Sequence, residues 1–121
     1  MAIKKALRLR KTGVSTSAAL FTLYSNRVES GRAECFQQLA WEIDKVTSGG
    51  NTRVRLYIEG HGYKHFIEEQ DIPAASTLYT YSKPLYLYES ERLALEIDQA
   101  QTATAVKLFG TGYWQSIWEG G

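Results

Sequence analysis

The sequence predicts an all-β fold, a single antiparallel β-sandwich, and three observations support this prediction. The first is residues 83–114, where apolar and polar side chains alternate through three short runs, at 85–88, 93–98 and 105–108. A repeat of two residues indicates a strand with one buried and one solvated face. The second is that polar turn sequences separate these runs. The third is that similar runs recur upstream at near-regular spacing, which is typical of a sandwich, here of jelly-roll-like type.

Length and composition are those of one globular domain. A chain of 121 residues with 44% hydrophobic content buries roughly two-thirds of its unfolded surface, which disfavours disorder. The apolar runs are too short to span a membrane, and the basic start of the chain lacks the apolar core of a signal peptide. Cys35 is the only cysteine, so no intrachain disulfide can form, as suits a protein made in a reducing compartment.

Charge is distributed unevenly along the chain. Residues 1–28 hold six basic residues and no acid, whereas the remainder holds eight basic and thirteen acidic residues. We expect two parts, a basic N-terminal arm or edge strand at 1–17 and the sandwich domain at 18–121. The basic candidates for partner binding are Lys4, Lys5, Arg8, Arg10 and Lys11. Such an arm suits an acidic partner, including a neighbouring copy; nucleic acid and a solvated edge strand are the rival interpretations.

The upstream runs follow the same pattern. Residues 3–10 alternate as an edge strand or an extended arm does, with Leu7 and Leu9 on one side. A small polar link follows at 11–17, and alternation resumes in 18–28.

Residues 33–46 fit two kinds of element. Phe36, Leu39, Ile43 and Val46 have helical spacing, whereas Leu39, Trp41 and Ile43 have strand spacing. The turn sequence that follows, 48–51, favours a strand that pairs directly with the next run, 53–58, as a hairpin.

The middle of the chain predicts further strands. In 53–58 the apolar residues should face the core and the others should face outward. The inward set is Val54, Leu56 and Ile58, and the outward set is Arg53, Arg55 and Tyr57. We expect a short strand at 63–67, a connection at 68–75 and another strand at 77–81.

Residues with catalytic chemistry are present without a catalytic pattern. His61 and His65 would share a face in a strand but lie about 13 Å apart, and glycines flank His61, so we expect neither a helix nor a metal site. Five acids fall in turns or at outward positions, where solvation explains them. They are Asp71, Glu89, Glu91, Glu96 and Asp98. Cys35 lacks a nucleophile motif, so the sequence predicts no enzyme and no cofactor.

Tyrosines are concentrated in the predicted strands, several on the face opposite the aliphatic residues. They are Tyr57, Tyr79, Tyr81, Tyr86 and Tyr88. Tyrosine and tryptophan are enriched at interfaces because they add contact area with a polar tip. We therefore add Tyr86, Tyr88 and Trp114 to the partner-binding candidates. A strand buried on both faces and a glycan-stacking platform are the alternatives.

Residues 55–114 resemble small β-sandwich virion proteins of tailed bacteriophages. The matching features are the turn at 72–74, Leu85 and Leu87, Glu91 and Leu93, and the alanine- and threonine-rich strand 102–110 that ends on glycine. These features all lie within the last two-thirds of the chain. The resemblance carries a strand-and-turn pattern and no catalytic motif.

The resemblance implies a structural role as a capsid cement or decoration protein, with the tail or neck as other locations. It would be made in the host cytoplasm and would bind the major capsid protein on the virion surface as a homotrimer. We expect deletion of residues 2–11 to leave the fold intact and abolish particle binding. One alternative is a tail or fibre module that binds host glycan through Trp114, Trp118 or surface tyrosines. A small hydrolase using His61 is the other.

Overall fold

In a computed structural model the protein is all-β, with nine strands among the residues that the structure describes. The structure describes residues 4–15, 20–44, 52–60, 62–71, 73–99 and 103–116. The strands are β1 Lys5–Val14, β2 Phe21–Tyr24, β3 Arg32–Ile43, β4 Arg53–Gly60, β5 Tyr63–Asp71, β6 Tyr79–Tyr81, β7 Leu85–Leu87, β8 Arg92–Asp98 and β9 Ala105–Ser116. Within these ranges there is no helix of the length and hydropathy needed to cross a membrane.

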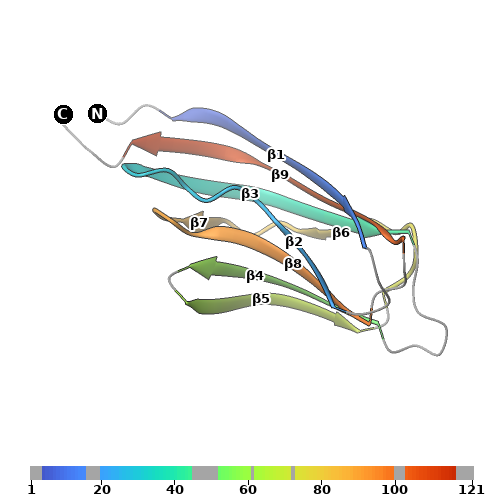
Figure 1. Ribbon diagram of the computed structural model, residues 1–121. Coiled ribbons are helices and arrows are strands. Elements are labelled where there is room, and N and C mark those ends of the chain that lie inside the picture. Colours follow the sequence, from blue (N-terminus) through green and yellow to red (C-terminus); the bar gives the residue numbers. More distant parts are fainter. Residues whose placement is uncertain are drawn as a thin grey trace.

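Two antiparallel sheets pack face to face (Figure 1). Sheet A has the order β1-β9-β3-β6, with β7 pairing with β3 alongside β6. Sheet B has the order β2-β8-β4-β5. The chain passes repeatedly from one sheet to the other, and β6 and β7 act as one interrupted strand. A five-stranded and a four-stranded antiparallel sheet packed in this way form a β-sandwich, so the predicted all-β sandwich class is confirmed.

The core lies between the sheets and consists of the residues that alternate inward. On β8, Leu93, Leu95 and Ile97 are each fully buried. The remaining core residues are Leu23, Val28, Phe36, Leu39, Trp41, Ile43, Val54, Leu56, Ile58, Leu87, Val106 and Leu108. The inward set predicted for 53–58 is therefore correct.

The basic N-terminal segment is an edge strand of sheet A. Strand β1 pairs with β9 along its whole length, from Lys5 opposite Trp114 to Val14 opposite Ala105. Leu7 and Leu9 also pack against the core. The sequence allowed two interpretations of this segment, an edge strand and an arm. The pairing shows that residues 5–14 form an edge strand and not a detachable arm. The expectation that residues 2–11 can be removed without harm to the fold conflicts with this pairing.

Residues 32–43 form strand β3, so the helical alternative for this segment is wrong. Leu39, Trp41 and Ile43 all face the core, as strand spacing requires. The predicted hairpin with 53–58 is also wrong, because β3 pairs with β9, β6 and β7, whereas β4 lies in sheet B. The connection crosses between sheets so that both strands bury their inward residues in one core. The predicted turn at 48–51 lies outside the described residues.

Tyr57 faces outward from sheet B as predicted, yet only 1% of it is exposed. The ring of Phe66 lies 5.2 Å from its ring, and the ammonium of Lys64 lies 5.2 Å from the same ring. Both come from β5, which extends to Asp71 and so occupies part of the segment predicted as a connection. Burial is the main reason that the pKa of Tyr57 is raised.

Candidate protein-binding surface

The outer face of sheet B carries charges that pair with one another, a set called here the charge ladder. The Arg53 guanidinium contacts Asp71 at 2.6 Å and Glu69 at 3.7 Å. Arg55 contacts Glu69 at 2.8 Å and Glu96 at 3.6 Å. Asp71 and Glu96, two of the acids considered for catalysis, thus have arginine partners. These arginines already have carboxylate partners within the sheet, so another molecule gains little by covering them.

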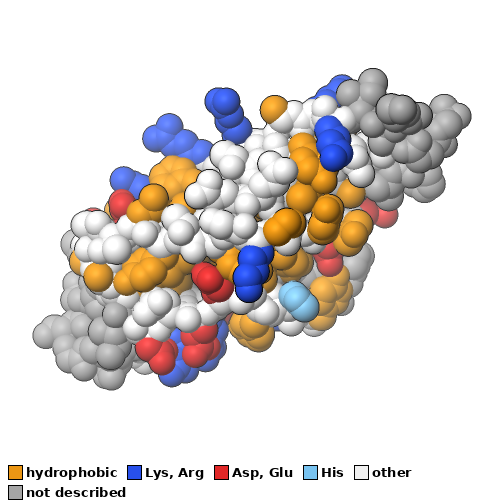
Figure 2. All heavy atoms as spheres, turned by 180° about the vertical axis from the view of Figure 1, so that it is seen from behind, with side chains coloured by type: hydrophobic (Ala, Val, Ile, Leu, Met, Phe, Trp, Pro, Cys, Tyr) orange, Lys and Arg blue, Asp and Glu red, His pale blue; other side chains and the backbone are white. Residues whose placement is uncertain are grey.

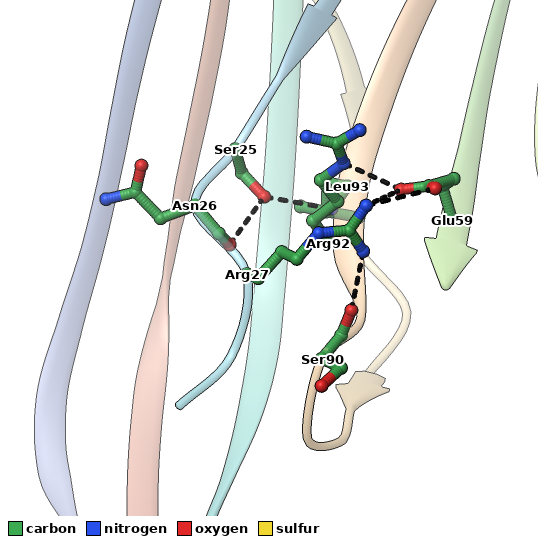
Figure 3. Close-up of polar contacts among 7 residues, drawn as sticks. All are labelled: Ser25, Asn26, Arg27, Glu59, Ser90, Arg92 and Leu93. Carbon is green, nitrogen blue, oxygen red and sulfur yellow. Dashed lines mark hydrogen bonds and ion pairs between the residues drawn. The ribbon is translucent and has the colours of Figure 1, made fainter. Parts of the chain in front are cut away.

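A second polar network fixes the link between β2 and β8 (Figure 3). Glu59 accepts from Arg92 at 2.6 Å and pairs with Arg27 at 3.0 Å. The hydrogen bond from Arg92 is the largest cause of the lowered pKa of Glu59. Arg27 also donates to the carbonyl of Ser90 at 2.7 Å. These contacts hold the chain leaving β2 against β8, which is a structural role.

Ser25 extends this network with two hydrogen bonds to the backbone of Leu93. Its hydroxyl accepts from the backbone N–H of Leu93 at 2.8 Å, and its own N–H donates to the Leu93 carbonyl at 3.0 Å. The backbone of Val28 exchanges hydrogen bonds with Glu91 and Ser90 in the same way. Residues 25–28 therefore continue along β8 beyond the end of β2.

The outer face of sheet A differs in being free of charge over its centre. Register places a row of neutral side chains there, opposite in direction to the core residues Leu39 and Leu108. This uncharged face consists of Cys35, Gln38, Ala40, Tyr86, Phe109, Thr111 and Tyr113. Figure 2 views the molecule from behind, where neutral and apolar side chains cover the area beneath a row of basic ones at the upper margin, and a basic and an acidic side chain lie just below the centre.

A shallow cavity of about 280 Å³ lies on the uncharged face. Gln38, Ala40, Phe109 and Thr111 line it, together with Leu78, which is 53% exposed. The cavity offers an apolar side chain of a partner a place to insert.

Two tyrosines lie on either side of Cys35 on this face. The register places Cys35 opposite Tyr113 on β9 and opposite Tyr86 on β7. A hydrogen bond between the two phenols is the main cause of the raised pKa of Tyr113, and contact with Cys35 adds to it. Tyr86 remains 49% exposed. These residues give the face a polar, aromatic centre that a partner can cover without desolvating a charge.

The basic candidates for partner binding lie on both faces of β1. Arg8 and Arg10 pair in register with Thr111 and Phe109 and border the uncharged face. Neither arginine forms an ion pair with any residue in the described ranges. Lys4 lies 4.5 Å from the ring of Tyr113. These three bases form a basic margin along the uncharged face.

The other predicted site residues lie elsewhere. Lys5 and Arg32 lie 5.1 Å and 3.8 Å from the ring of Trp114, so both cations cover that ring at the end of the sandwich. Lys11 donates to the amide oxygen of Asn26 at 3.1 Å. Tyr88 is 55% exposed but follows the end of β7. The structure thus brings Lys4, Arg8, Arg10 and Tyr86 together, and leaves Lys5, Lys11, Tyr88 and Trp114 apart from them.

Sequence reasoning missed most of the uncharged face. Phe109 and Tyr113 could have been found, because they alternate with Val106 and Leu108 in a run already predicted as a strand. Cys35 and Gln38 had no such signal, since their segment fitted a helix equally well. Tyr79 and Tyr81, predicted to share one face of their strand, both pack partly buried against the core.

A separate groove, called here the edge groove, lies between β5 and β6. It has a volume of about 270 Å³, and its lining includes Trp41, Tyr79, Glu68 and Gln70. The rings of Trp41 and Tyr79 stack with centroids 4.5 Å apart. Burial raises the pKa of Glu68, against a smaller opposing effect of Lys83. An aromatic ring beside a carboxyl and an amide is a combination that can bind a polar ring such as a sugar.

The residues weighed for metal or nucleophilic chemistry form no such site in the described ranges. No group of three His, Cys, Asp or Glu side chains there lies close enough to hold a metal ion. His65 is exposed on β5, and Cys35 is 2% exposed. His61, Trp118 and residues 1–3 lie outside the described residues.

No protein-family model, no curated protein and no solved structure matches this chain.

Proposed function

We propose that this protein is a structural, non-enzymatic virion protein that decorates or cements a phage capsid. One observation supports this role: the two outer faces of the sandwich differ in kind. The charges of sheet B pair within the molecule, whereas the centre of sheet A is neutral and aromatic and carries a cavity. A neutral face costs less to desolvate, and aromatic residues are typical of interfaces. The uncharged face is therefore the side that meets the partner.

The identity of the partner comes from the sequence resemblance. Residues 55–114 resemble small sandwich proteins of phage virions, so the partner is the major capsid protein, with copies of the chain associating as a homotrimer. The protein is made in the host cytoplasm and ends on the capsid surface. The basic margin steers it toward an acidic shell, and attachment through several subunits strengthens modest contacts.

Co-sedimentation with capsids that lack the protein tests the proposal. The variant Tyr86→Glu/Thr111→Glu places two charges on the uncharged face at exposed positions. We expect it to bind at least about a hundredfold more weakly, because those charges would be buried at the interface without partners. The matched control is Leu20→Glu, an exposed apolar residue just before β2 of sheet B, 58% exposed. Thermal unfolding checks that both variants fold.

Undiminished capsid binding by the Tyr86→Glu/Thr111→Glu variant would exclude the uncharged face as the interface. If the wild type binds no capsid, a glycan-binding module of a tail or fibre becomes the better proposal. The edge groove favours that second candidate, since Trp114 has cations over its ring and is a poor stacking platform. Binding on a glycan array that is lost in Tyr79→Ala would identify it.

A further inference from the structure

Two long edge strands lie at opposite margins of the molecule (Figure 1). Strand β1 has ten residues and ends sheet A, and β5 has nine residues and ends sheet B. Among the described residues each pairs with a neighbour on one side only, so its other side presents backbone donors and acceptors. Neither strand contains proline, a residue that commonly blocks the pairing of edge strands. The other outer strands, β2, β6 and β7, have only four, three and three residues.

The two edges carry opposite charge. Residues 8–11 of β1, with the sequence RLRK, hold three bases in four residues, and β1 holds no acid. Residues 68–71 of β5, with the sequence EEQD, hold three acids in four residues. This acidic part lies beyond the β-bulge of β5 and stays in regular register with 53–56 of β4.

The acidic surplus at β5 remains after the charge ladder is counted. Apart from the paired Glu59 and Arg92, four bases and five acids gather on and beside the strand. The bases are Arg53, Arg55, Lys64 and Lys83, and the acids are Glu68, Glu69, Asp71, Glu96 and Asp98. At β1, by contrast, Arg8 and Arg10 have no acidic partner among the described residues. The charges of β1 are therefore complementary to those of β5, whereas two copies of the same edge strand are not complementary.

We propose that β1 of one copy pairs with β5 of the next, which joins sheet A of one subunit to sheet B of its neighbour. A β1–β1 pair would set four basic residues against four and is disfavoured by repulsion. A head-to-tail contact is heterologous, so it closes into a ring or continues as a filament. This inference rests on the self-association within the proposed function and assigns the surfaces that make it.

The first test is the mass of the isolated protein in solution as a function of protein and salt concentration. We expect wild type to associate, and Arg8→Glu/Arg10→Glu to associate about a hundredfold more weakly, because like charges then face each other. Both arginines are exposed and unpaired with described residues, so the variant should fold. Added salt should weaken the wild-type contact by screening. Wild type that stays monomeric at about 1 mM, or a variant that associates normally, overturns the proposal.

Cross-linking identifies the strands that meet. Arg10→Cys and Gln70→Cys are made as separate proteins of distinguishable mass and mixed with a short bismaleimide. We expect mixed dimers from that pair and none from Leu20→Cys with Gln70→Cys. Wild type provides the background, since Cys35 is buried. If Gln70→Cys links mainly to itself, the contact is β5–β5 and the proposal is wrong. Capsid binding is measured separately, so either proposal can fail while the other stands.

Discussion

At the scale of single residues, Gly112 is the most constrained position in the sheet contacts. A Cβ built there overlaps the carbonyl oxygen of Cys35 and lies 3.0 Å from the Cα of Phe36. These are backbone atoms of β3, next to the register shift between Phe36 and Gln38, so they cannot rotate away as a side chain can. We expect Gly112→Ala to lower the free energy of unfolding by about 3 kcal/mol, measured by denaturant titration.

Gly13→Ala is the matched control for this substitution. Its Cβ would lie 3.1 Å from the tips of the Leu23 and Phe21 side chains, which can move slightly. The expected loss is within about 1 kcal/mol. Equal losses in the two variants would show that the contact with the β3 backbone is not what requires glycine at 112.

Glu59 links stability to pH because two arginines hold its carboxylate. Its pKa is lowered from 4.5, first by the hydrogen bond from Arg92. A lowered pKa means that the stabilisation is fully present above the unfolded value of 4.5 and is lost as pH falls through the folded value. Glu59→Gln should therefore be about 1 kcal/mol less stable at neutral pH and nearly equal to wild type at strongly acid pH.

Denaturant titrations of wild type and Glu59→Gln across that pH range measure the effect. Glu89→Gln is the control, since Glu89 is exposed and has no ion pair with the described residues. The effect of ionisation on stability has the opposite sign at Glu34. Burial raises the pKa of its carboxyl, so its ionisation at neutral pH lowers the stability of the fold. A deficit of Glu59→Gln that persists unchanged in acid would exclude the carboxylate charge as its source.

At the scale of elements, a strand could be predicted from the sequence where the alternation and the turn residues agree. The neighbouring strand with which it pairs could not be predicted. Val54, Leu56 and Ile58 were assigned correctly to the core because their alternation leaves one apolar face. The pairing of β3 was predicted wrongly, since a glycine-rich turn suggests a hairpin equally well when the chain crosses between sheets. Local sequence specifies which face of a strand is buried, but the shared core decides which strand lies beside it.

The candidate surface was likewise predictable from the sequence only in part. Arg8, Arg10 and Tyr86 were predicted from charge and alternation, and the structure places them on one side of sheet A. Their neighbours from β3 and β9 come together only through the pairing of β3 with β9 and β7. Trp114 could not be judged from sequence, because the cations over its ring come from β1 and β3.

At the scale of the whole molecule, the surfaces of the fold differ in chemical character. Sheet B pairs its own charges, sheet A presents neutral and aromatic residues, and the long edges carry opposite charge. Our proposals assign the uncharged face to the capsid and the two edges to copies of the chain. The near-zero net charge of +1 hides this arrangement, because the bases of β1 and the acids at 68–71 of β5 offset one another in the sum.

The first and last strands also make the domain depend on both ends of its chain. Strand β9 lies between β1 and β3, so loss of β1 exposes one side of β9 and uncovers the core beneath Leu7 and Leu9. Deletion of residues 2–11 should therefore lower the free energy of unfolding by about 3 kcal/mol or more, a large part of the stability of a small domain. Arg8→Glu/Arg10→Glu, which keeps the strand and reverses its charge, should unfold close to wild type. Thermal unfolding followed by circular dichroism compares the three proteins. If the deletion variant is as stable as wild type, the fold does not need β1, and the segment is a dispensable arm.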